Sequence, residues 1–323
     1  MLNKVISDIT SPRERYPLTE DLHSQNLGYY YFVFDEKRVA AGKDQKLIKK
    51  FDENGIPINR TYIDVTDKQY VYFPISIGQM GLSVFHTYLQ TKKDVDFLRF
   101  MKFVDWFYNH VEIDDTLGAR WLTDVSLPQY KNPGPWQSAF SQARAISILL
   151  RGYQQTGLKK YLDLAELALQ PFTLPVSKGG VTSFTEFGPF YEEYTAEVPT
   201  LVLNGMIFSL CGIYDFVRVF PEHELASELY HNGIKTLTKT IKEYDIGYWS
   251  RYNLCKADWY PEIDLATITY QHLHILQLEL LYRLTENDVF KTYAARFKKQ
   301  VKVINMIKMY ITKYHGLKKL KRL

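Results

Sequence analysis

Three carboxylates and two phenols lie within seven residues of one short stretch of the chain, residues 191–197 (YEEYTAE). Pro199 follows, and an apolar run with helical spacing covers residues 201–216. Proline is favoured in the first turn of a helix because its missing N–H would have no partner there. We therefore expect a loop at the N-terminal end of a buried helix, where backbone N–H groups favour an anionic substrate and proton chemistry. The alternative is that these acids only cap the helix and face water.

A repeat of helical patterns surrounds this stretch. From residue 75 onward, short turns recur at intervals of about 65 residues, near residues 88–93, 153–157, 214–221 and 281–285. Each unit consists of an apolar helix, a turn and an amphipathic helix, which is typical of stacked helical hairpins. The sequence therefore predicts a mainly α fold, an incomplete (α/α) toroid of about four helical hairpins.

The N-terminal part of the chain has a different pattern. Residues 29–34 (YYYFVF) and 70–73 (YVYF) are rich in aromatic and β-branched residues, which favour strands. We predict an extended N-terminal arm with a β-hairpin over residues 1–74, a catalytic toroid over residues 75–295, and a basic amphipathic helix or tail over residues 296–323.

In such a toroid the more apolar helices are the inner ones, and the loops that lead into them meet on one face. These loops are residues 70–74, 133–136, 191–199 and 268–270, and each carries an aromatic residue. Tyrosine stacks on sugar rings and forms hydrogen bonds, so the 25 Tyr of the chain fit a carbohydrate site. The loops predict a polysaccharide cleft with carboxylates at its floor. The alternatives are aromatic residues that only plug the end of the toroid, or a tyrosine-rich core.

The composition is that of an ordinary soluble globular protein, with 323 residues, 46% of them hydrophobic and 24% charged. Two cysteines, Cys211 and Cys255, form no disulfide framework and are consistent with a reducing compartment. Residues 1–11 contain no apolar segment of a secretory signal, and no run of 18 apolar residues occurs. We expect a cytoplasmic protein, with membrane association as an open alternative.

The charge of +4 is unevenly placed, because residues 296–323 hold ten Lys or Arg and no Asp or Glu. Proteins that bind double-stranded nucleic acid usually carry their basic surface on the folded body, so we expect no nucleic-acid partner. Two hypotheses remain for this tail: an outer helix that closes the toroid, or a peripheral anchor on an anionic membrane. Its apolar positions predict one helical stripe, formed by Phe297, Val301, Ile304, Ile307, Ile311 and Tyr314.

Several catalytic motifs are absent from the sequence. There is no Gly-rich phosphate loop and no nucleophile elbow. His272 and His274 are two residues apart in a helical pattern, so their side chains diverge and they are poor joint metal ligands. We therefore expect no catalytic metal and no cofactor, which leaves Tyr, Glu, Asp, Arg and His as catalysts.

Five blocks of the chain resemble the D-glucuronyl C5-epimerases, which convert glucuronate to iduronate in heparan-type chains, including heparosan and heparan sulfate. The blocks occur in the order of that family and span most of residues 54–295. They are residues 70–83 (YVYFPISIGQMGLS), 136–147 (WQSAFSQARAIS), 191–194 with 202–205 (YEEY and VLNG), 252–254 (YNL) and 270–278 (YQHLHILQL). The resemblance implies an (α/α) helical domain, a β-hairpin arm and a homodimer in which the arm reaches the partner.

The resemblance also implies roles for single residues. Glu193 matches the acid/base residue of the family, and Tyr194 matches a tyrosine needed for activity. Tyr252 and Tyr270 match two further essential tyrosines, the latter acting on the opposite face of the sugar. The blocks and the converging loops supply the candidate substrate-binding residues, which are Tyr70, Tyr72, Gln79, Trp136, Gln142, Arg144, Glu192, Asn204, Lys256 and His274.

The chain departs from the family pattern in three ways. We expect no counterpart of the β-barrel that animal members carry between the arm and the helical domain. Thr195 stands where the family has Pro, and Cys255 stands where the family has the Arg that would hold the substrate carboxylate. Lys256 is the nearest cation, but it is a point charge and not a bidentate fork.

Epimerisation at C5 removes a hydrogen alpha to a carboxylate, so the site must supply hydrogen-bond donors to the developing dianion. Inversion needs one group on each face of the sugar. We expect Glu193 to be the base and Tyr270 to return a proton, on a glucuronate-containing polysaccharide. The alternatives are a polysaccharide lyase, which would remove the same proton and expel the C4 substituent, and a non-catalytic glycan-binding protein.

Overall fold

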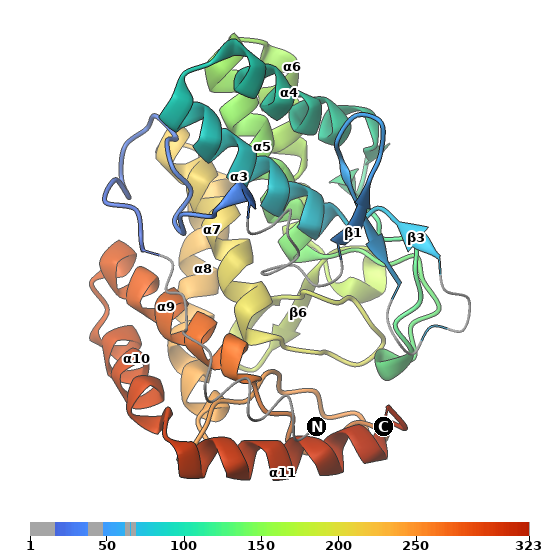
Figure 1. The fold of residues 1–323 in the computed structure, drawn as a ribbon, viewed down its shortest axis with the longest axis vertical. Helices are drawn as coiled ribbons and strands as arrows, with labels where there is room; N and C mark the ends of the chain where they lie inside the picture. Colours follow the sequence, from blue (N-terminus) through green and yellow to red (C-terminus); the bar gives the residue numbers. More distant parts are fainter. Residues whose placement is uncertain (1–16, 38–47, 62–64, 66–68, 323) are drawn as a thin grey trace.

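The computed structural model describes residues 17–37, 48–61, 65 and 69–322. Across these residues the fold is mainly helical, with small antiparallel sheets (Figure 1). The predicted mainly α class is therefore confirmed.

Within the described chain, four helical hairpins follow one another. The first helix of each hairpin packs against the first helix of the next, since α3 contacts α5, α5 contacts α7 and α7 contacts α9. The turns lie where the sequence repeat predicts them. The hairpins are α3 (Pro74–Thr91) with α4 (Asp94–Asn109), α5 (Ala139–Thr156) with α6 (Lys159–Leu167), α7 (Leu203–Val219) with α8 (Glu224–Thr240), and α9 (Ile268–Thr285) with α10 (Asp288–Gln300).

Three of the hairpin turns share one local structure. Each first helix ends in a threonine, and the next residue has a left-handed backbone that stops the helix. The threonine hydroxyl oxygen then accepts the N–H of the residue two positions on, at 3.2–3.3 Å. The repeat in the sequence therefore reflects a repeated turn chemistry. The residues are Thr91 and Lys92, Thr156 and Gly157, and Thr285 and Glu286.

Short strands and 3₁₀ helices fill the connections. Among the described residues, three antiparallel strands precede α3, and two β-hairpins lie between the helical hairpins. The strands are β1 (Ile48–Phe51), β2 (Pro57–Arg60), β3 (Tyr70–Val71), β4 (Glu112–Asp114), β5 (Gly118–Arg120), β6 (Thr182–Thr185) and β7 (Gly188–Tyr191). The 3₁₀ helices are η1 (Pro128–Tyr130), η2 (Gln170–Thr173), η3 (Val176–Lys178) and η4 (Ile241–Tyr244).

The prediction of a strand at residues 29–34 is wrong. This segment is irregular and has one isolated bridge, between Leu18 and Phe32. Tyr31 is fully buried and Phe32 is 1% exposed, so the aromatic side chains serve as core filling and not as one face of a sheet. The second predicted strand, at residues 70–73, is present only as the two residues of β3.

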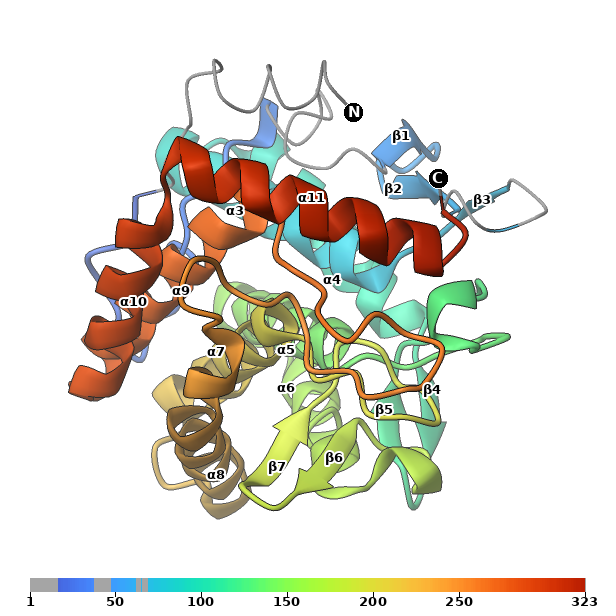
Figure 2. The ribbon, with the colours of Figure 1, turned by 90° about the horizontal axis from the view of Figure 1, so that it is seen from below.

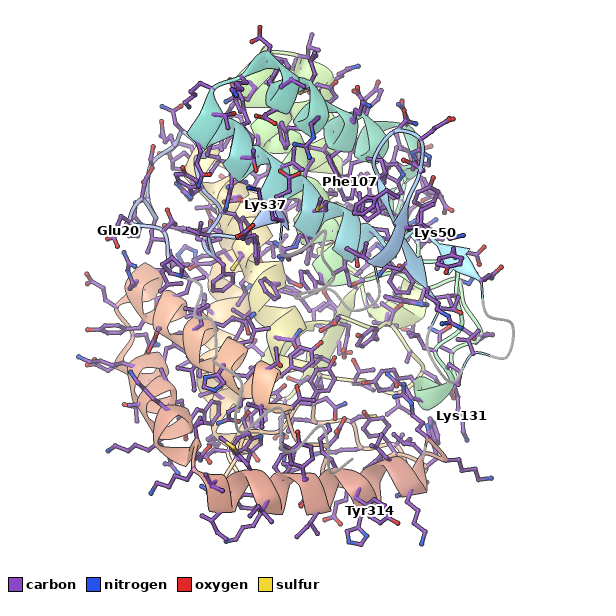
Figure 3. All side chains as sticks on the ribbon, viewed as in Figure 1. Glu20, Lys37, Lys50, Phe107, Lys131 and Tyr314 are labelled. Atoms are coloured by element: carbon purple, nitrogen blue, oxygen red, sulfur yellow. The ribbon has the colours of Figure 1, made fainter. Side chains whose placement is uncertain are left out.

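The last helix, α11 (Val303–Lys319), lies across one side of the helical body (Figures 1 and 2). α10 ends at Gln300, so the predicted stripe from Phe297 to Tyr314 is not continuous. Phe297 is fully buried in α10, whereas Tyr314 lies on the side of α11 that faces away from the other elements (Figure 3). Across the described ranges, every helix is too short or too polar to cross a bilayer.

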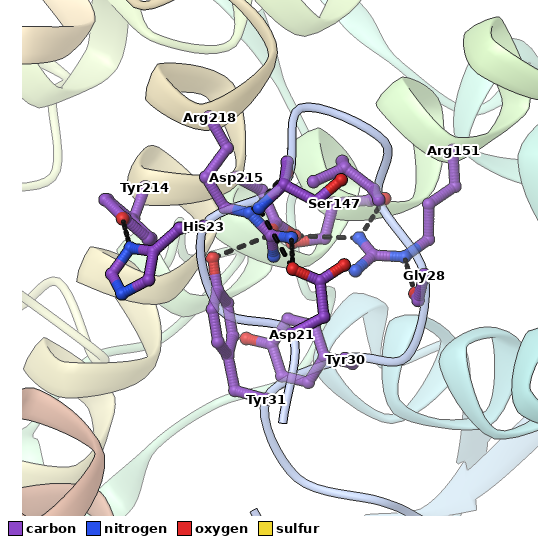
Figure 4. Close-up of polar contacts among 12 residues, drawn as sticks. Asp21, His23, Gly28, Tyr30, Tyr31, Ser147, Arg151, Tyr214, Asp215 and Arg218 are labelled. Carbon is purple, nitrogen blue, oxygen red and sulfur yellow. Dashed lines mark hydrogen bonds and ion pairs between the residues drawn. The ribbon is translucent and has the colours of Figure 1, made fainter. Parts of the chain in front are cut away.

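A buried ionic cluster fixes residues 17–37, here called the N-terminal segment, to the helices (Figure 4). Asp215 on α7 accepts a hydrogen bond from the Tyr31 hydroxyl and one from the Arg151 guanidinium, each at 2.7 Å. The side chains of Asp215 and Arg151 are 0% exposed. Arg151 on α5 also donates to the carbonyl oxygen of Gly28 at 3.2 Å. The cluster therefore joins α5, α7 and the N-terminal segment at one point.

We expect Asp215→Ala to lower the free energy of unfolding by about 3–5 kcal/mol, because it leaves the buried Arg151 charge without its partner. Urea unfolding followed by circular dichroism measures the change. The matched control is Asp163→Ala, which removes an ion pair whose side chains, Lys159 and Asp163, are 80% and 53% exposed. That control should cost less than about 1 kcal/mol. Equal losses in the two variants would contradict a structural role for the cluster.

Candidate active site

The loops that lead into α3, α5, α7 and α9 meet at one end of these helices, as the sequence predicts. The ring centroids of Phe73 and Trp136 are 6.3 Å apart, and those of Trp136 and Tyr194 are 5.3 Å apart. Tyr252 and Tyr270 complete the set, with ring centroids 5.0 Å apart. Aromatic rings from the loops before α3, α5 and α7, from the long connection before α9 and from the first turn of α9 therefore form one cluster.

The Glu192 carboxylate anchors the loop between β7 and α7. It is 1% exposed and accepts hydrogen bonds from the hydroxyls of Ser183 and Thr200, both at 2.6 Å. The backbone N–H of Leu201 donates a third, at 2.9 Å. These three donors, one on β6 and two just before α7, satisfy the buried carboxylate, so its hydrogen-bond partners all belong to the protein. Contact of Glu192 with substrate stays a prediction.

These hydrogen bonds also explain why α7 begins at Leu203 and not at Pro199. The N–H of Leu201 is bound to a side chain, and Leu201 has a φ of 50°, which is outside the right-handed helical region. The prediction that Pro199 starts the helix is therefore wrong by one turn.

Glu193 packs against the first turn of α7. Its Oε2 atom accepts a hydrogen bond from the Asn204 amide at 3.0 Å. A Cβ atom at Gly205 would lie 2.4 Å from the Cβ of Glu193 and 2.6 Å from its Oε2, so glycine is needed for this close approach. The carboxyl group thus lies at the N-terminal end of a buried helix, which is the position that the sequence predicts.

The surroundings of Glu193 suit proton transfer near neutral pH. The side chain is 4% exposed, and burial raises the pKa of Glu193 from 4.5 to about 7, against the opposing effect of hydrogen bonds from Tyr194 and Asn204. A general base or acid is most effective when its pKa lies near the working pH. Glu193 has that property.

The two remaining candidate tyrosines are neutral hydrogen-bond donors. Burial raises the pKa of Tyr252 well above its usual value, as does the nearby charge of Glu193, whereas hydrogen bonding with Tyr194 lowers it. Burial and the charge of Glu193 likewise raise the pKa of Tyr270, and hydrogen bonding with Tyr252 lowers it. Tyr252 packs against the apolar cluster that contains Tyr194, and its ring contacts that of Tyr270, so the pKa of Glu193 and those of the tyrosines depend on one another. The structure brings the four candidate catalytic residues together.

Two candidate substrate-binding tyrosines contact the small sheet. Tyr70 is 44% exposed, and the Lys50 ammonium lies 4.2 Å from its ring centroid. Tyr72 donates a hydrogen bond to Asp52 at 2.9 Å, and its ring lies near Trp106 of α4. Contact of these two tyrosines with substrate stays a prediction. Trp136, by contrast, packs against Phe73 and Tyr194 of the aromatic cluster.

Other candidates are buried between the helices. Arg144 donates to the side-chain oxygen of Gln79 at 2.9 Å, and Gln142 donates to two backbone carbonyls. His274 is hydrogen-bonded to the Ser250 hydroxyl at 2.9 Å, and burial lowers the pKa of His274 to about 3, which keeps it neutral. The structure gives these side chains internal partners, and a direct contact of any of them with substrate stays a prediction.

The position of the family arginine is buried in this chain. Cys255 is 6% exposed and belongs to the apolar cluster around Tyr194, whereas the neighbouring Lys256 is exposed. The cysteine side chain therefore packs in an apolar cluster. Binding of the substrate carboxylate by Lys256 stays a prediction.

Sequence reasoning missed a second set of polar residues behind Tyr194. The rings of Tyr130 and Tyr194 are in contact, with centroids 5.4 Å apart. The Asn253 amide donates to the hydroxyls of Tyr130 and Tyr260 at 3.1 and 2.8 Å. The Tyr260 hydroxyl donates to Asp264 at 2.8 Å. Of these residues, only Asn253 lies in a block that resembles the family. The others are brought together by contacts between distant parts of the chain, which no local sequence pattern indicates.

The structure contains a cavity of about 480 Å³, but none of the candidate residues lines it. That cavity lies at the C-terminal end of α9, whereas Tyr270 lies in its first turn. In the part of the chain that the structure describes, no group of three or more His, Cys, Asp and Glu has the geometry to hold a metal ion. The cavity is lined by Glu20, Leu22, His23, Tyr282, Arg283, Glu286 and Asp288.

The sequence matches a family of known proteins. A model of the family described as D-glucuronyl C5-epimerase C-terminus matches residues 114–299, which include Glu193, Tyr252 and Tyr270. The match covers more than half of the chain, so the chain belongs to this family.

Two curated relatives are each 30% identical to the chain. One is an uncharacterized protein of Methanocaldococcus jannaschii, aligned over 182 residues, which are 55% of this chain and 56% of the relative. The other is the D-glucuronyl C5-epimerase of Caenorhabditis elegans, aligned over 176 residues, which are 51% of this chain and 29% of the relative. The chain thus spans about half the length of the first relative and less than a third of the second.

The raised pKa of Glu193 makes its ionisation costly for the fold. Below pH 4.5 the carboxyl group is protonated in both states, and as pH rises to about 7 it ionises first in the unfolded chain. Stability should therefore fall over that interval, by about 3 kcal/mol in total. We expect Glu193→Gln to abolish this loss, so that the variant exceeds the native protein in stability at about pH 8 and not at about pH 4.

Urea unfolding at the two pH values measures this difference. The matched control is Glu197→Gln, which changes an exposed carboxylate of the same loop and should give the same difference from the native protein at both pH values. A stability difference for Glu193→Gln that does not change with pH would show that the carboxyl group is not shielded from water.

We expect Tyr260→Phe to lower the free energy of unfolding by about 1–3 kcal/mol, because Asn253 and Asp264 each lose a buried hydrogen-bond partner. Thermal and urea unfolding report the change. Tyr248→Phe is the matched control, since its hydroxyl has one part-buried contact, with Thr312 at 3.2 Å, outside the cluster. A loss no larger than that of the control would mean that the hydroxyl network behind Tyr194 contributes little.

Proposed function

We propose that the protein is an isomerase that epimerises D-glucuronate residues to L-iduronate residues within a polysaccharide, by removal and return of the proton at C5. The observation that carries the proposal is a buried carboxyl group, Glu193, with a pKa of about 7, which lies beside a cluster of three tyrosines and accepts a hydrogen bond from Asn204. Family membership supports the reaction type, since one relative is named a D-glucuronyl C5-epimerase.

The first step in this proposal breaks the C5–H bond. The ionised Glu193 carboxylate takes the proton, and the electron pair moves into the adjacent carboxylate of the sugar to form an enediolate. Hydroxyl groups stabilise this dianion best when they are neutral and already oriented. In this proposal Tyr194 and Tyr252 supply those hydroxyl groups, and the exposed Lys256 adds a positive charge.

The second step forms a new C5–H bond on the opposite face of the sugar. The Tyr270 hydroxyl donates the proton and becomes a phenolate, while Glu193 holds the proton it removed. After product release, Glu193 gives its proton to solvent and the Tyr270 phenolate takes one from solvent, which restores the starting state. In the reverse direction the roles of Glu193 and Tyr270 exchange.

The finer architecture belongs to the same proposal. The order of contacts from α3 through α5 and α7 to α9 fits an incomplete (α/α) toroid whose inner helices deliver the site loops. We propose that the N-terminal arm pairs two chains as a homodimer. Trp136 and Asn204 are the substrate-binding candidates that contact the catalytic cluster, through Tyr194 and Glu193.

The test is incubation with an unsulfated glucuronate polymer of the heparosan type in D₂O, with deuterium at C5 read by NMR. We expect exchange without added metal or nucleotide. Glu193→Gln and Tyr270→Phe should each lower the exchange rate about 10²–10⁴-fold, because each removes one of the two proton-transfer groups. The exchange rate should also rise with pH through about 7, as Glu193 ionises.

Glu197→Gln is the matched control, because it removes an exposed carboxylate four residues from Glu193 and should leave exchange unchanged. Full activity of both Glu193→Gln and Tyr270→Phe would overturn the assignment of the two groups. An unsaturated uronate in the product would identify a lyase instead, and binding without exchange would identify a glycan-binding protein.

A further inference from the structure

Helix α11 buries one face and exposes another that is also apolar. On the buried face, Met306 and Met309 are 4% and 1% exposed and pack against Trp249 and Leu265. Lys313 on the same face forms an ion pair with Asp264 at 3.0 Å. This face holds the helix on the protein, so the apolar residues of the other face are not needed for docking α11.

The outward face carries five large apolar side chains between 43% and 58% exposed. At 100° per residue, their positions fall within an arc of about 100° of the helix surface. They form five of the fourteen exposed large hydrophobic side chains of the described residues. An exposed apolar strip of this kind marks an interaction surface. Its members, the outward stripe, are Val303, Ile304, Ile307, Ile311 and Tyr314.

The charges beside the outward stripe are all positive. Residues 296–323 contain ten Lys or Arg and no acid. Lys308 is exposed along one edge of the stripe, and Lys318 is exposed at its C-terminal end. Helix α11 also lies beyond residues 114–299, so it is outside the part of the chain that the family model matches.

We propose that α11 lies in the plane of an anionic lipid bilayer, with the outward stripe in the boundary of the acyl chains and the lysines among the headgroups. An interfacial helix combines a strip of Ile and aromatic residues with a basic flank. A second copy of the chain fits this surface less well, because a symmetric contact would bring the lysines of both copies together. A polyanionic glycan would be attracted by the lysines, but it offers no partner for isoleucine side chains.

This surface is tied to the candidate active site. Lys313 donates hydrogen bonds to Asp264 and to the carbonyl oxygen of Leu265, and Lys319 donates to the carbonyl oxygen of Tyr260. These residues belong to the long loop that also carries Tyr252. A bilayer that binds the outward stripe would therefore hold the catalytic loop close to the membrane surface.

Vesicle co-sedimentation of the full chain tests the proposal. The vesicles contain phosphatidylcholine and phosphatidylglycerol in equal amounts, or phosphatidylcholine alone. We expect binding to the mixed vesicles that weakens with salt. The double variant Ile307→Asp with Ile311→Asp should weaken that binding by about tenfold or more, because it places charge in the apolar boundary. Circular dichroism should show an unchanged fold, since both side chains are exposed.

The matched control is Val95→Asp with Leu98→Asp, which changes two apolar side chains of α4 that are 59% and 61% exposed. It should bind vesicles as the native protein does. Equal loss in both double variants, or equal binding of all three proteins, would overturn the proposal. Loss of a dimer in the α11 variant without vesicle binding by the native protein would assign the stripe to a second copy. Binding to a soluble glucuronate polymer, with no binding to vesicles, would assign the basic flank to the glycan.

Discussion

The hydrogen bonds to the Glu192 carboxylate are the constraint on which the candidate site depends. A buried carboxylate is tolerated only when donors of the protein replace its water, and here Ser183, Thr200 and one backbone N–H do so. They fix the loop at the point where the next side chain, Glu193, must lie against the first turn of α7. Burial raises the pKa of both carboxyl groups, but only Glu193 faces the tyrosine cluster. Two adjacent residues of one type thus have different tasks, one structural and one suited to proton transfer.

A second buried carboxylate, Asp215, lies on α7 itself, and its contacts make the site rigid. Asp215 lies eleven residues after Asn204, which is about 16 Å along the helix. At that point Tyr31 and Arg151 bind it, so the N-terminal segment and α5 are fixed to α7 away from the chemistry. The loop that carries Glu193 then has a fixed helix end to pack against. A proton-transfer group needs such support, because small displacements of reacting groups reduce rates strongly.

The sequence predicted most of what depends on local chemistry. The hairpin turns were predictable because Thr91, Thr156 and Thr285 end their helices in the same way, and the repeat carries that signal. The N-terminal segment was mistaken for a strand, because aromatic residues favour strands and core filling equally and only the packed structure distinguishes them. The candidate catalytic residues were found through blocks that resemble a family. The ring contact between Tyr130 and Tyr194 joins distant loops, and no pattern in either loop encodes it.

The absence of the family arginine has a consequence for how the proposed chemistry would work. Cys255 is buried, so the glucuronate carboxylate would meet neutral phenols before it meets a cation. An anion brought close to Glu193 in a poorly solvated site raises the pKa of that carboxyl further, because like charges disfavour ionisation. Glu193 would then be a stronger base in the complex than in the free protein, and substrate binding would be favoured by the protonated form. The phenols of Tyr194 and Tyr252 oppose this effect, since they donate hydrogen bonds that become stronger as negative charge develops. Neutral donors can therefore favour the enediolate over the bound substrate, which is what lowers a barrier.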